Sequence, residues 1–427
     1  MIEKTLLGTR VSKSFTISEH SCENIVAEYF GMSGGFVNDV CDIEIPDGCK
    51  IVYITGESGS GKSVILRELF PEYEAETIPA DIPLYLWGGE SDDEQHRTME
   101  SLSLVGLSDA LNFVSTYDEL SDSQQARARL YLEIASEKPV IVVDEFLSTL
   151  DRRTAKAVSF VVQKAVRKSG KVLFAATAHD DLIDYLQPDL VVRGRAFPSS
   201  FDVVPNEPSG KNPFIDEVIV RYGTKEEYRS DRLGELHYKG KYTGGVKEFL
   251  FAEIDGRIIG VLVSIYNMHT GGRRIARLVV HPTYRCCGIG QMLVRRYLSD
   301  FENVDVVAAM GLVNPVFEKA GMARVEDSVS KAPNGLADSI MSLGFDLSKW
   351  HNCPYCVSFC QQREARAVVS RFAKKATHLV QPGGVHIGED SIRKKILDDS
   401  NTAGRVLYQL RPHRMAKYVW SVEEGAE

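Results

Sequence analysis

The sequence GESGSGKS at residues 56–63 decides the fold of the first half of this chain. It follows the apolar run Ile51–Thr55 and leads into a stretch typical of a helix, Val64–Phe70. A glycine-rich loop between a strand and a helix lets backbone N–H groups converge on phosphate oxygens. The pattern therefore predicts that the chain binds a nucleoside triphosphate.

The side chains of this loop have separate expected roles. Lys62 supplies a positive charge near the β- and γ-phosphates, and Ser63 offers its hydroxyl to Mg²⁺. The alternative is an ordinary glycine-rich turn, which the flanking strand and helix patterns disfavour. The residues expected to surround the phosphates are Gly56, Ser58, Gly59, Gly61, Lys62 and Ser63.

A pair of acidic residues follows a second apolar run, about eighty residues further on. Val140–Val143 has the pattern of a buried strand, and it ends in Asp144 and Glu145. One carboxylate in such a place holds Mg²⁺ through water, and a second orients the attacking water. We therefore expect Asp144 to support the metal and Glu145 to act as the catalytic base.

Three further segments stand in a characteristic order around this acidic pair. LSDSQ (120–124) precedes an Ala/Arg/Leu-rich helical stretch, and STLD (148–151) and AHD (178–180) follow the pair. Together the segments resemble the head of the ABC-type ATPases, which hold ATP and Mg²⁺. The resemblance implies that the LSGGQ-like segment of one head, with Ser121 and Gln124, closes over ATP bound by another. It also implies that Asp151 lies at the dimer seam, that His179 senses the γ-phosphate, and that the working unit is a homodimer.

Two features depart from that family. Asp122 and Ser123 replace both glycines of the LSGGQ pattern, so side chains lie where backbone approaches a phosphate, which argues against fast hydrolysis. About sixty residues separate Lys62 from Leu120, too few for the full helical subdomain that couples transporter heads to membrane partners.

Length and composition indicate a multidomain, cytoplasmic protein. A chain of 427 residues predicts two or three domains, and 44% hydrophobic residues are ample for packed cores. It contains no run of about eighteen apolar residues and no N-terminal signal pattern, so we expect no membrane-spanning segment and no membrane association. A transporter would need separate membrane subunits. The net charge of −9 argues against a uniformly basic surface for nucleic acid, although local patches can still bind phosphate. The eight scattered cysteines do not resemble a secreted disulfide framework.

The first domain is expected to end where composition changes. FPSSFDVVPNEPSGKNP (197–213) is dense in Pro, Ser, Gly and Asn and has no helical or strand period. We therefore expect an ATPase domain over residues 1–198 and a linker over residues 199–213.

Beyond the linker, the sequence predicts an antiparallel sheet and a second phosphate-binding turn. Phe249–Ile254 and Ile258–Tyr266 are joined by Asp255-Gly256, a strong hairpin signal. A third strand, Ile275–Val280, runs into HPTYRCCGIG (281–290) and then a helical stretch, Gln291–Tyr297. Small residues at a helix N-terminus favour an anion here as well.

This second turn resembles the R-x-x-G-x-G loop with which GNAT acyltransferases hold the pyrophosphate of acetyl-CoA on backbone N–H groups. The later segment NPVFEKAGM (314–322) is similar to that family's asparagine and tyrosine-glutamate-lysine segment. The alternative is an ordinary α/β turn. The resemblance implies an α+β acyltransferase domain over residues 214–349 that binds acetyl-CoA or another acyl-CoA. The residues implied for this cofactor are Leu278, Val280, Arg285, Gly288, Ile289, Gly290, Asn314 and Phe317.

The GNAT resemblance has a departure of its own at Phe317. The family's tyrosine commonly protonates the departing CoA thiolate, and a phenyl ring has no proton to donate. Candidate bases for the acceptor amine are His281, Glu253 and His237, and His281 is best placed by sequence at a strand end. A histidine before proline at a strand end is also a common surface or capping residue.

The whole order resembles an uncharacterised family described as an ABC-type ATPase fused to a predicted acetyltransferase domain, over roughly residues 1–345. The expected fold class is thus α/β: a P-loop ABC-type head, then a GNAT-like α+β domain, then a small Cys-containing tail over residues 350–427.

The tail begins with a cluster of thiols, Cys353, Cys356 and Cys360, next to His351. The Cys-x₂-Cys spacing allows a Zn²⁺ site, to which Cys22, Cys41 or Cys49 would add ligands if the fold brings them near. The alternative is reduced cysteines packed beside aromatic side chains. After Gln361 the tail has twelve Lys/Arg against eight Asp/Glu, interleaved with aromatic residues such as Tyr408, Tyr418 and Trp420. That mixture is compatible with a nucleic-acid strand or with a solvated strand pair.

Two classes of function follow from these features. The first is an ATP-driven N-acyltransferase that acts on a large substrate, foremost an amine of DNA or RNA, with a small amine or a protein as the variant. The second is a regulatory ATPase whose GNAT fold senses acyl-CoA without turnover, which the departures at Asp122, Ser123 and Phe317 favour.

Overall fold

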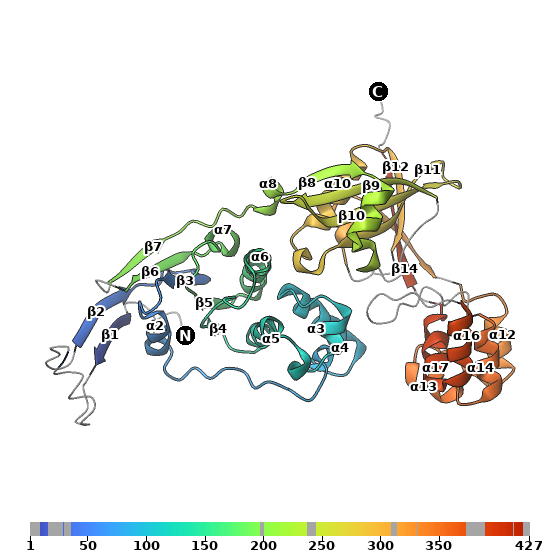
Figure 1. Ribbon diagram of the computed structural model, residues 1–427, viewed down its shortest axis with the longest axis horizontal. Coiled ribbons are helices and arrows are strands. Elements are labelled where there is room, and N and C mark those ends of the chain that lie inside the picture. The colour runs from blue at the N-terminus through green and yellow to red at the C-terminus, as the bar shows by residue number, and fades with distance from the viewer. Residues whose placement is uncertain are drawn as a thin grey trace. The chain divides into compact units, whose positions relative to one another are not determined.

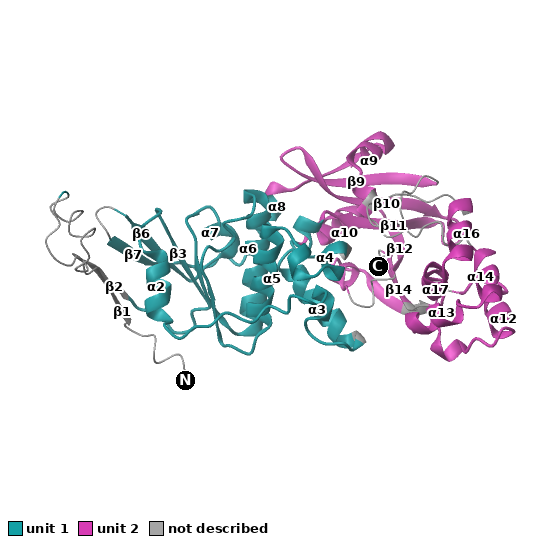
Figure 2. Ribbon diagram, turned by 60° about the horizontal axis from the view of Figure 1, so that its bottom comes forward, with its two compact units in different colours: residues 1–216, 282–287 teal, residues 217–281, 288–427 magenta. Residues whose placement is uncertain are grey.

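The computed structural model describes residues 9–15, 29, 36–196, 200–236, 245–308, 314–329, 331–372, 389–412 and 414–421. Two compact units make up the chain, shown in different colours in Figure 2. The first comprises residues 1–216 together with the short segment 282–287, and the second comprises residues 217–281 and 288–427. The segment 282–287 is therefore separated in sequence from the rest of its unit.

The first unit is built on a five-stranded sheet in the order β4-β5-β3-β6-β7. Neighbouring strands among β3 to β6 run parallel, and β7 is antiparallel to β6. The strands are β3 (Ile51–Gly56), β4 (Val140–Val143), β5 (Val172–Ala176), β6 (Leu190–Arg195) and β7 (Ser200–Pro205). The predicted strands before the phosphate-binding loop and before the acidic pair are confirmed.

Both faces of this sheet are covered, which is why its parallel strands β3, β4 and β5 are mainly apolar and β6 begins with the apolar residues Leu190, Val191 and Val192. Successive residues of β3 point to opposite faces: Ile51 and Tyr53 join one core, and Val52 and Ile54 join the other. Helix α6 (Arg152–Ser169) contributes to the first core and α2 (Lys62–Leu69) to the second. A two-stranded antiparallel pair, β1 (Thr9–Phe15) with β2 (Phe36–Ile43), completes the sheets of this unit.

A helical segment lies between β3 and β4 in the chain. It consists of η1 (Leu84–Leu86), α3 (Asp92–Leu104), α4 (Ala110–Val114), η2 (Tyr117–Glu119) and α5 (Asp122–Ala135). Its apolar side chains, among them Leu84, Leu102 and Leu130, belong to the same core as Ile51 and Tyr53. The segment is thus packed into the unit.

The predicted linker is only partly a linker. Residues 200–205 form β7, and Val191, Val192 and Arg193 of β6 pair with Val204, Val203 and Asp202. The Pro and Ser residues of the segment hid this strand, because an edge strand tolerates Pro where its N–H would face away from the ladder.

The second unit contains a seven-stranded sheet in the order β13-β14-β12-β11-β10-β9-β8. Strands β11 and β12 pair in parallel, and the other neighbouring pairs are antiparallel. The strands are β8 (Ile219–Gly223), β9 (Val246–Ile254), β10 (Arg257–Asn267), β11 (Gly272–Val280), β12 (Asn303–Ala308), β13 (Ala323–Val329) and β14 (Arg414–Ser421). The predicted hairpin, β9 with β10, and the predicted third strand, β11, are confirmed.

The described residues of the second unit also form α9 (Lys225–Asp231), η3 (Leu233–Leu236), α10 (Ile289–Leu298) and α11 (Val316–Lys319). The turn η4 (Pro282–Tyr284) belongs to the first unit. A short helix, α8 (Phe214–Glu217), and α7 (Ile183–Leu186) precede them in the chain.

The tail contributes to the sheet, which the sequence did not indicate. Strand β14 lies between β12 and β13, where Tyr418 pairs with Val306 on one side and Arg324 on the other. Between β13 and β14 the chain forms a helical insert with its own core, visible as one cluster in Figure 1. The insert comprises α12 (Leu336–Met341), η6 (Leu347–Lys349), α13 (Cys353–Phe359), α14 (Arg363–Ser370), α16 (Glu389–Asp398) and α17 (Ser400–Gln409). The boundary expected after residue 349 therefore falls inside this insert.

Within the described part of the chain, no helix combines the length and the apolar character needed to span a bilayer.

Candidate nucleotide and acyl-CoA sites

The phosphate-binding loop adopts the backbone that its glycines predict. Gly56, Gly59 and Gly61 have φ values of 139°, 82° and 94°, in the region that residues with a Cβ seldom adopt. A Cβ on Gly56 would also lie 2.0 Å from the carbonyl oxygen of Gly194 on β6. Gly56 is thus required by the packing of two strands as well as by the loop.

The side chains of the loop are arranged to receive an anion. The Lys62 Nζ donates to the carbonyl oxygens of Gly56 at 2.9 Å and Glu57 at 2.8 Å, so the ammonium group lies inside the loop. Ser60 Oγ is buried and has no hydrogen-bond partner among the described residues. Ser63 is half-buried in the first turn of α2, where its hydroxyl would serve Mg²⁺, and Ser58 is exposed. The residues present therefore fit a triphosphate with its metal ion.

The acidic pair and His179 lie at the same edge of the sheet as this loop. Asp144 and Glu145 are exposed at the carboxyl end of β4, and β5 lies between β4 and β3. At about 4.8 Å between strands, the ends of β4 and β3 are roughly 10 Å apart. The His179 carbonyl oxygen accepts a hydrogen bond from the Thr55 Oγ1 at 3.0 Å. The Tyr53 hydroxyl donates to the same oxygen. His179 is thereby held next to the start of the phosphate-binding loop.

Asp151 serves as the N-cap of α6, because its carboxylate accepts a hydrogen bond from the Thr154 N–H at 3.1 Å. Burial acts to raise the pKa of this carboxyl group, but hydrogen bonds from Thr154 and Arg153 and the charge of Arg127 outweigh it. The net result is a pKa below the ordinary value. Asp151 is therefore a fixed anion at a helix N-terminus.

The LSGGQ-like segment forms the first turn of α5. Gln124 Oε1 accepts from the Ser121 N–H at 2.8 Å and from the Ser121 hydroxyl at 3.0 Å. The Gln124 amide then donates to Asn112 Oδ1 at 2.9 Å, which ties α5 to α4. Asp122, in place of a glycine, is exposed in this turn.

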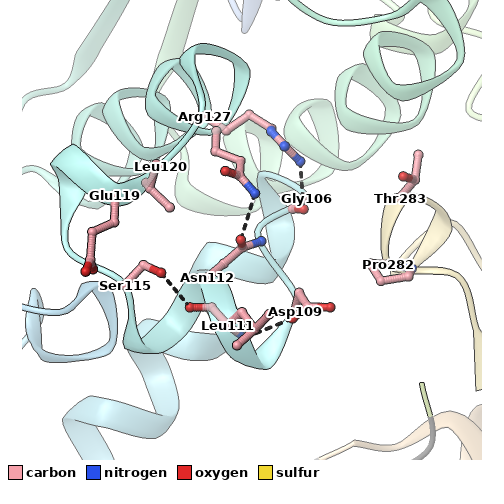
Figure 3. A pocket seen from close by; sticks show the side chains of 11 residues that line it. Gly106, Asp109, Leu111, Asn112, Ser115, Glu119, Leu120, Arg127, Pro282 and Thr283 are labelled. Atoms are coloured by element: carbon pink, nitrogen blue, oxygen red, sulfur yellow. Dashed lines mark hydrogen bonds between the residues drawn. The ribbon is translucent and has the colours of Figure 1, made fainter. Parts of the chain in front are cut away.

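A polar cavity of about 460 Å³ adjoins this segment (Figure 3). Arg127 reaches toward Gly106, to whose carbonyl oxygen it donates at 2.8 Å. Pro282 and Thr283, from the segment that is distant in sequence, line the opposite side of the cavity. Sequence analysis did not identify Asn112, Arg127 or Gly106 as neighbours of the Ser121 segment, because no motif covers them.

In the second unit, β11 pairs in parallel with β12 at its start, through Arg273, Arg274 and Ile275, and β12 pairs with β14 as far as Ala308. Opposite Val263 and Ser264 of β10, the register shifts, so that β11 carries a bulge at Ala276. The bulge lies just before the part of β11 that leads into the predicted turn.

The predicted turn after β11 leads into the N-terminus of α10. Gly288 is the N-cap with φ of 89°, and a Cβ on Gly290 would lie 3.2 Å from Val316, 3.5 Å from Leu278 and 3.8 Å from Val280. The predicted residues Leu278, Val280 and Gly290 are therefore neighbours, and Ile289 is buried beneath them. N–H groups in the first turn of a helix have no partner within the helix, so the N-terminus of α10 fits the pyrophosphate of an acyl-CoA.

Arg285 differs from the prediction. It belongs to the first unit, where its guanidinium donates to the Ser108 carbonyl oxygen, and burial lowers its pKa. The guanidinium is thus engaged with the backbone between α3 and α4.

Asn314 and Phe317 flank the start of α11. Asn314 Oδ1 accepts from the Val316 N–H at 3.2 Å, and the asparagine is exposed. Phe317 is buried and packs its ring 5.4 Å from that of Tyr418 on β14. Phe317 thus forms part of the packing between α11 and the sheet.

The candidate bases are differently placed. His281 is exposed and its N–H donates to the Ile259 carbonyl oxygen at 2.8 Å, so it continues the ladder at the end of β11 next to the loop. Glu253 on β9 accepts from Arg221, which also pairs with Glu227 at 2.6 Å. His237 lies outside the described residues. A salt-bridged Glu253 is poorly suited to accept a proton from an amine, so His281 is the better placed of the two candidates within the described residues.

The cysteines of the tail lie in the core of the helical insert. Cys356 and Cys360 are fully buried beside Trp350 and Phe359, and the Cys356 thiol donates to the Trp350 carbonyl oxygen at 3.6 Å. Burial, together with the neighbouring cysteine, raises the pKa of each thiol to about 12. In the described part of the chain, no group of three or more potential ligands is placed to hold a metal ion, so the zinc reading is not supported.

Other cysteines that might have joined such a site are elsewhere. Cys49 is buried in the first unit, Cys41 is in β2, and Cys22 lies outside the described residues. Of the aromatic residues named for the tail, Tyr418 is fully buried in the sheet, whereas Tyr408 and Trp420 are half-buried.

Comparison with known proteins agrees with a division into an ATPase part and an acyltransferase part. Residues 216–315 match the family model of the GNAT acetyltransferases, which covers less than half of the chain. A methionine import ATP-binding protein of Acinetobacter baylyi is 24% identical over 305 residues, which are 55% of this chain and 88% of that protein. An energy-coupling factor transporter ATP-binding protein of Streptococcus thermophilus is 30% identical over 128 residues. That match spans 29% of this chain and 45% of the relative.

Two solved structures of one bacterial cassette also align with part of the chain. A dimeric bacterial ABC transporter cassette aligns with a TM-score of 0.33 and 16% identity, over 44% of this chain and 92% of that one. The same cassette in a post-hydrolysis state with ADP and phosphate aligns with a TM-score of 0.32 and 16% identity, over 43% and 91%. From the sequence relatives and the family model, the chain joins an ABC-type ATPase part to a GNAT acetyltransferase domain.

Proposed function

We propose that the protein is an ATP-dependent, acyl-CoA-dependent N-acyltransferase of the cytoplasm. The observation that carries the proposal is the N-terminus of α10 directly after β11, where Gly288 caps the helix with φ of 89° and the Cβ position of Gly290 lies against Val316, Leu278 and Val280. An acyl-CoA supplies an activated thioester. The acceptor amine attacks the thioester carbonyl carbon, its proton passes to a base, and the thiolate leaves as CoA. His281 is exposed at the end of β11 and is the candidate base.

The ATPase part is proposed to act as a homodimer. Asp144 and Glu145 lie at the sheet edge next to the phosphate-binding loop, as ATP hydrolysis with Mg²⁺ requires. The Ser121–Gln124 turn would complete the site of a second copy, as the resemblance to ABC-type heads implies. Because Asp122 and Ser123 replace glycines there, we expect slow turnover.

The proposed acceptor is an amine of DNA or RNA. A base amine in a duplex must first be exposed, at a cost of about a few kcal/mol, and ATP-driven clamping can meet that cost. Exposed basic side chains on α14 and α16 of the helical insert support this acceptor, although Glu364 and Asp390 lie among them. These basic residues are Arg363, Arg371, Arg393, Lys394 and Lys395.

The test is transfer of label from radiolabelled acetyl-CoA to DNA, RNA and total protein, each offered separately with and without ATP and Mg²⁺. The proposal expects ATP-dependent label in one nucleic acid. Label in protein or in a small amine alone would identify a different acceptor, and it would refute the nucleic-acid part.

A second candidate is a regulatory ATPase that senses acyl-CoA. The burial of Phe317 against Tyr418 favours it, because the family's proton donor is absent and a packed ring occupies its place. Tight binding of acetyl-CoA without label in any acceptor would favour the sensor over the transferase.

A further inference from the structure

The segment 282–287 is the part of the predicted acyl-CoA loop that the ATPase unit holds. Its flanking residues in the chain, His281 and Gly288, belong to the second unit, while the six residues between them belong to the first. A loop expected to bind the cofactor of one module is therefore built into the other.

The contacts of this segment within the first unit are numerous and specific. The Ser108 hydroxyl donates to the Pro282 carbonyl oxygen at 3.2 Å, and Arg285 donates to the Ser108 carbonyl oxygen. Asn212 donates through its side-chain amide to the Cys287 carbonyl oxygen at 2.8 Å. Backbone carbonyls and a charged side chain are thus satisfied by residues of the ATPase unit.

Apolar packing reinforces these bonds. The Tyr284 ring lies 6.1 Å from that of Phe214, edge to face, and Phe214 in turn packs against Phe160 of α6. Cys287 is fully buried, and its thiol donates to the Ala157 carbonyl oxygen of α6 at 3.8 Å. A buried aromatic ring in the middle of the segment and a fully buried thiol at its C-terminal end therefore anchor it.

The partners of the segment lead directly to the nucleotide-facing elements. Ser108 is two residues from Gly106, whose carbonyl oxygen accepts a hydrogen bond from Arg127 of α5, the helix that Ser121 begins. Ala157 lies in α6, the helix that Asp151 caps. A displacement of α5 or α6 on ATP binding would therefore move the docked segment.

We propose that the segment 282–287 couples the two sites: its docking on the ATPase unit sets the acyl-CoA affinity, and Arg285 acts as a docking residue instead of a pyrophosphate ligand. The inference rests on the proposed function, because it requires that both ATP and acyl-CoA bind. Docking preorganises the turn, with Cys286 at φ of 64° and Gly288 at φ of 89°, so that backbone N–H groups carry the pyrophosphate. Coupling between two binding sites is reciprocal, and typical values change each affinity about 5- to 150-fold.

The experiment is calorimetry on the full chain, with acetyl-CoA titrated in the absence and presence of a non-hydrolysable ATP analogue and Mg²⁺. We expect the analogue to tighten acetyl-CoA binding by about fivefold or more, and acetyl-CoA to tighten analogue binding by the same factor. Equal acetyl-CoA affinities with and without the analogue, in a chain that binds both ligands, would overturn the inference alone. A chain that binds no acetyl-CoA would overturn the proposed function as well.

Asn212→Asp is the most selective variant. Asn212 accepts from the Phe214 N–H at 3.1 Å through Oδ1, which a carboxylate preserves, while its donor to Cys287 is lost. We expect the ratio of acetyl-CoA affinities with and without the analogue to fall toward one. A ratio equal to that of the wild type would contradict the docking role.

Arg285→Ala separates docking from direct phosphate binding. If Arg285 is a docking residue, Arg285→Ala brings the ratio of acetyl-CoA affinities with and without the analogue to one and removes the effect of acetyl-CoA on nucleotide affinity. Arg285→Lys should restore part of both effects. If Arg285 instead binds the pyrophosphate directly, Arg285→Ala weakens acetyl-CoA binding equally with and without nucleotide, and the ratio of the two affinities stays as in the wild type. That result would refute the docking role. Arg296→Ala is the matched control, since Arg296 is on α10 and pairs with Asp300.

Discussion

At the scale of single residues, Lys62 is the most constrained cation of the ATP site. Its side chain is almost fully buried, and its ammonium group contacts only carbonyl oxygens that a phosphate would replace as partners. A charge-assisted hydrogen bond is worth about 1.5–3 kcal/mol, which corresponds to roughly 10- to 150-fold in affinity.

We therefore expect Lys62→Ala to weaken ATP binding by at least about tenfold, as measured by calorimetry with Mg²⁺. Arg67→Ala is the control, because Arg67 lies in the last turn of the same helix and is exposed. Equal ATP affinity in wild type and Lys62→Ala would mean that the loop at residues 56–63 does not hold the triphosphate.

Gly288 gives the corresponding residue-scale test of the acyl-CoA site. Its φ of 89° strains any side chain, and a Cβ would stand at the N-terminus of α10, where we place the pyrophosphate. Gly288→Leu should abolish acetyl-CoA binding in calorimetry.

The control for this variant is Gly256→Leu in the β9–β10 hairpin. Gly256 has φ of 73° and open space around its Cβ position, so it carries similar backbone strain without blocking the site. Acetyl-CoA affinity that survives Gly288→Leu, or that is lost equally in Gly256→Leu, would show that the predicted turn is not the cofactor site.

At the scale of structural elements, the helical insert makes a prediction about its thiols. The pKa of about 12 for Cys356 and Cys360 lies above the value near 8.5 of an unfolded thiol. The folded state therefore holds these protons more tightly, and its extra stability is complete below about pH 8.5 and is lost as the pH rises toward 12.

Alkylation with iodoacetamide at pH 8.5, followed by mass spectrometry, should therefore modify Cys356 and Cys360 much more slowly than the exposed Cys286. Because burial rather than a metal protects the thiols, a chelator should change neither their protection nor the melting temperature. Faster alkylation after addition of the chelator would restore the zinc interpretation.

Strand β14 supports a second prediction at this scale. It pairs with β12 on one side and with β13 on the other, so its removal leaves one edge of each of these strands unpaired. A chain that ends after residue 412 should lose acetyl-CoA binding and show early proteolysis of its second unit. A truncated chain that keeps acetyl-CoA binding and protease resistance would mean that the sheet is complete without β14.

At the scale of the whole molecule, Glu145 tests the dimeric mode of action. Glu145→Gln removes the carboxylate expected to orient water and should trap ATP between two heads. Light scattering coupled to size exclusion with ATP and Mg²⁺ should then show a dimer, whereas Glu137→Gln, in the exposed turn between α5 and β4, should behave as the wild type. A Glu145→Gln chain that remains monomeric with bound ATP would contradict the head-to-head arrangement.

The two phosphate-binding turns were predictable from sequence because each is determined by adjacent residues: small residues that allow the tight backbone turn, followed by a helix. The role of β14 and the engagement of Arg285 with Ser108 were not, because both depend on contacts between residues far apart in the chain. The same limit applies to Cys356 and Cys360, whose spacing suits a metal equally well and whose burial is set by the insert around them. Roles for Asp151, His179 and His281 remain predictions.

The central claim is that one chain holds an ATP site and an acyl-CoA site. The most direct measurement is equilibrium binding of both ligands to the full chain, to Lys62→Ala and to Gly288→Leu. The account predicts one ATP and one acetyl-CoA for each chain, with Lys62→Ala losing ATP while still binding acetyl-CoA, and Gly288→Leu the reverse. Binding of ATP alone by the unaltered chain would contradict it.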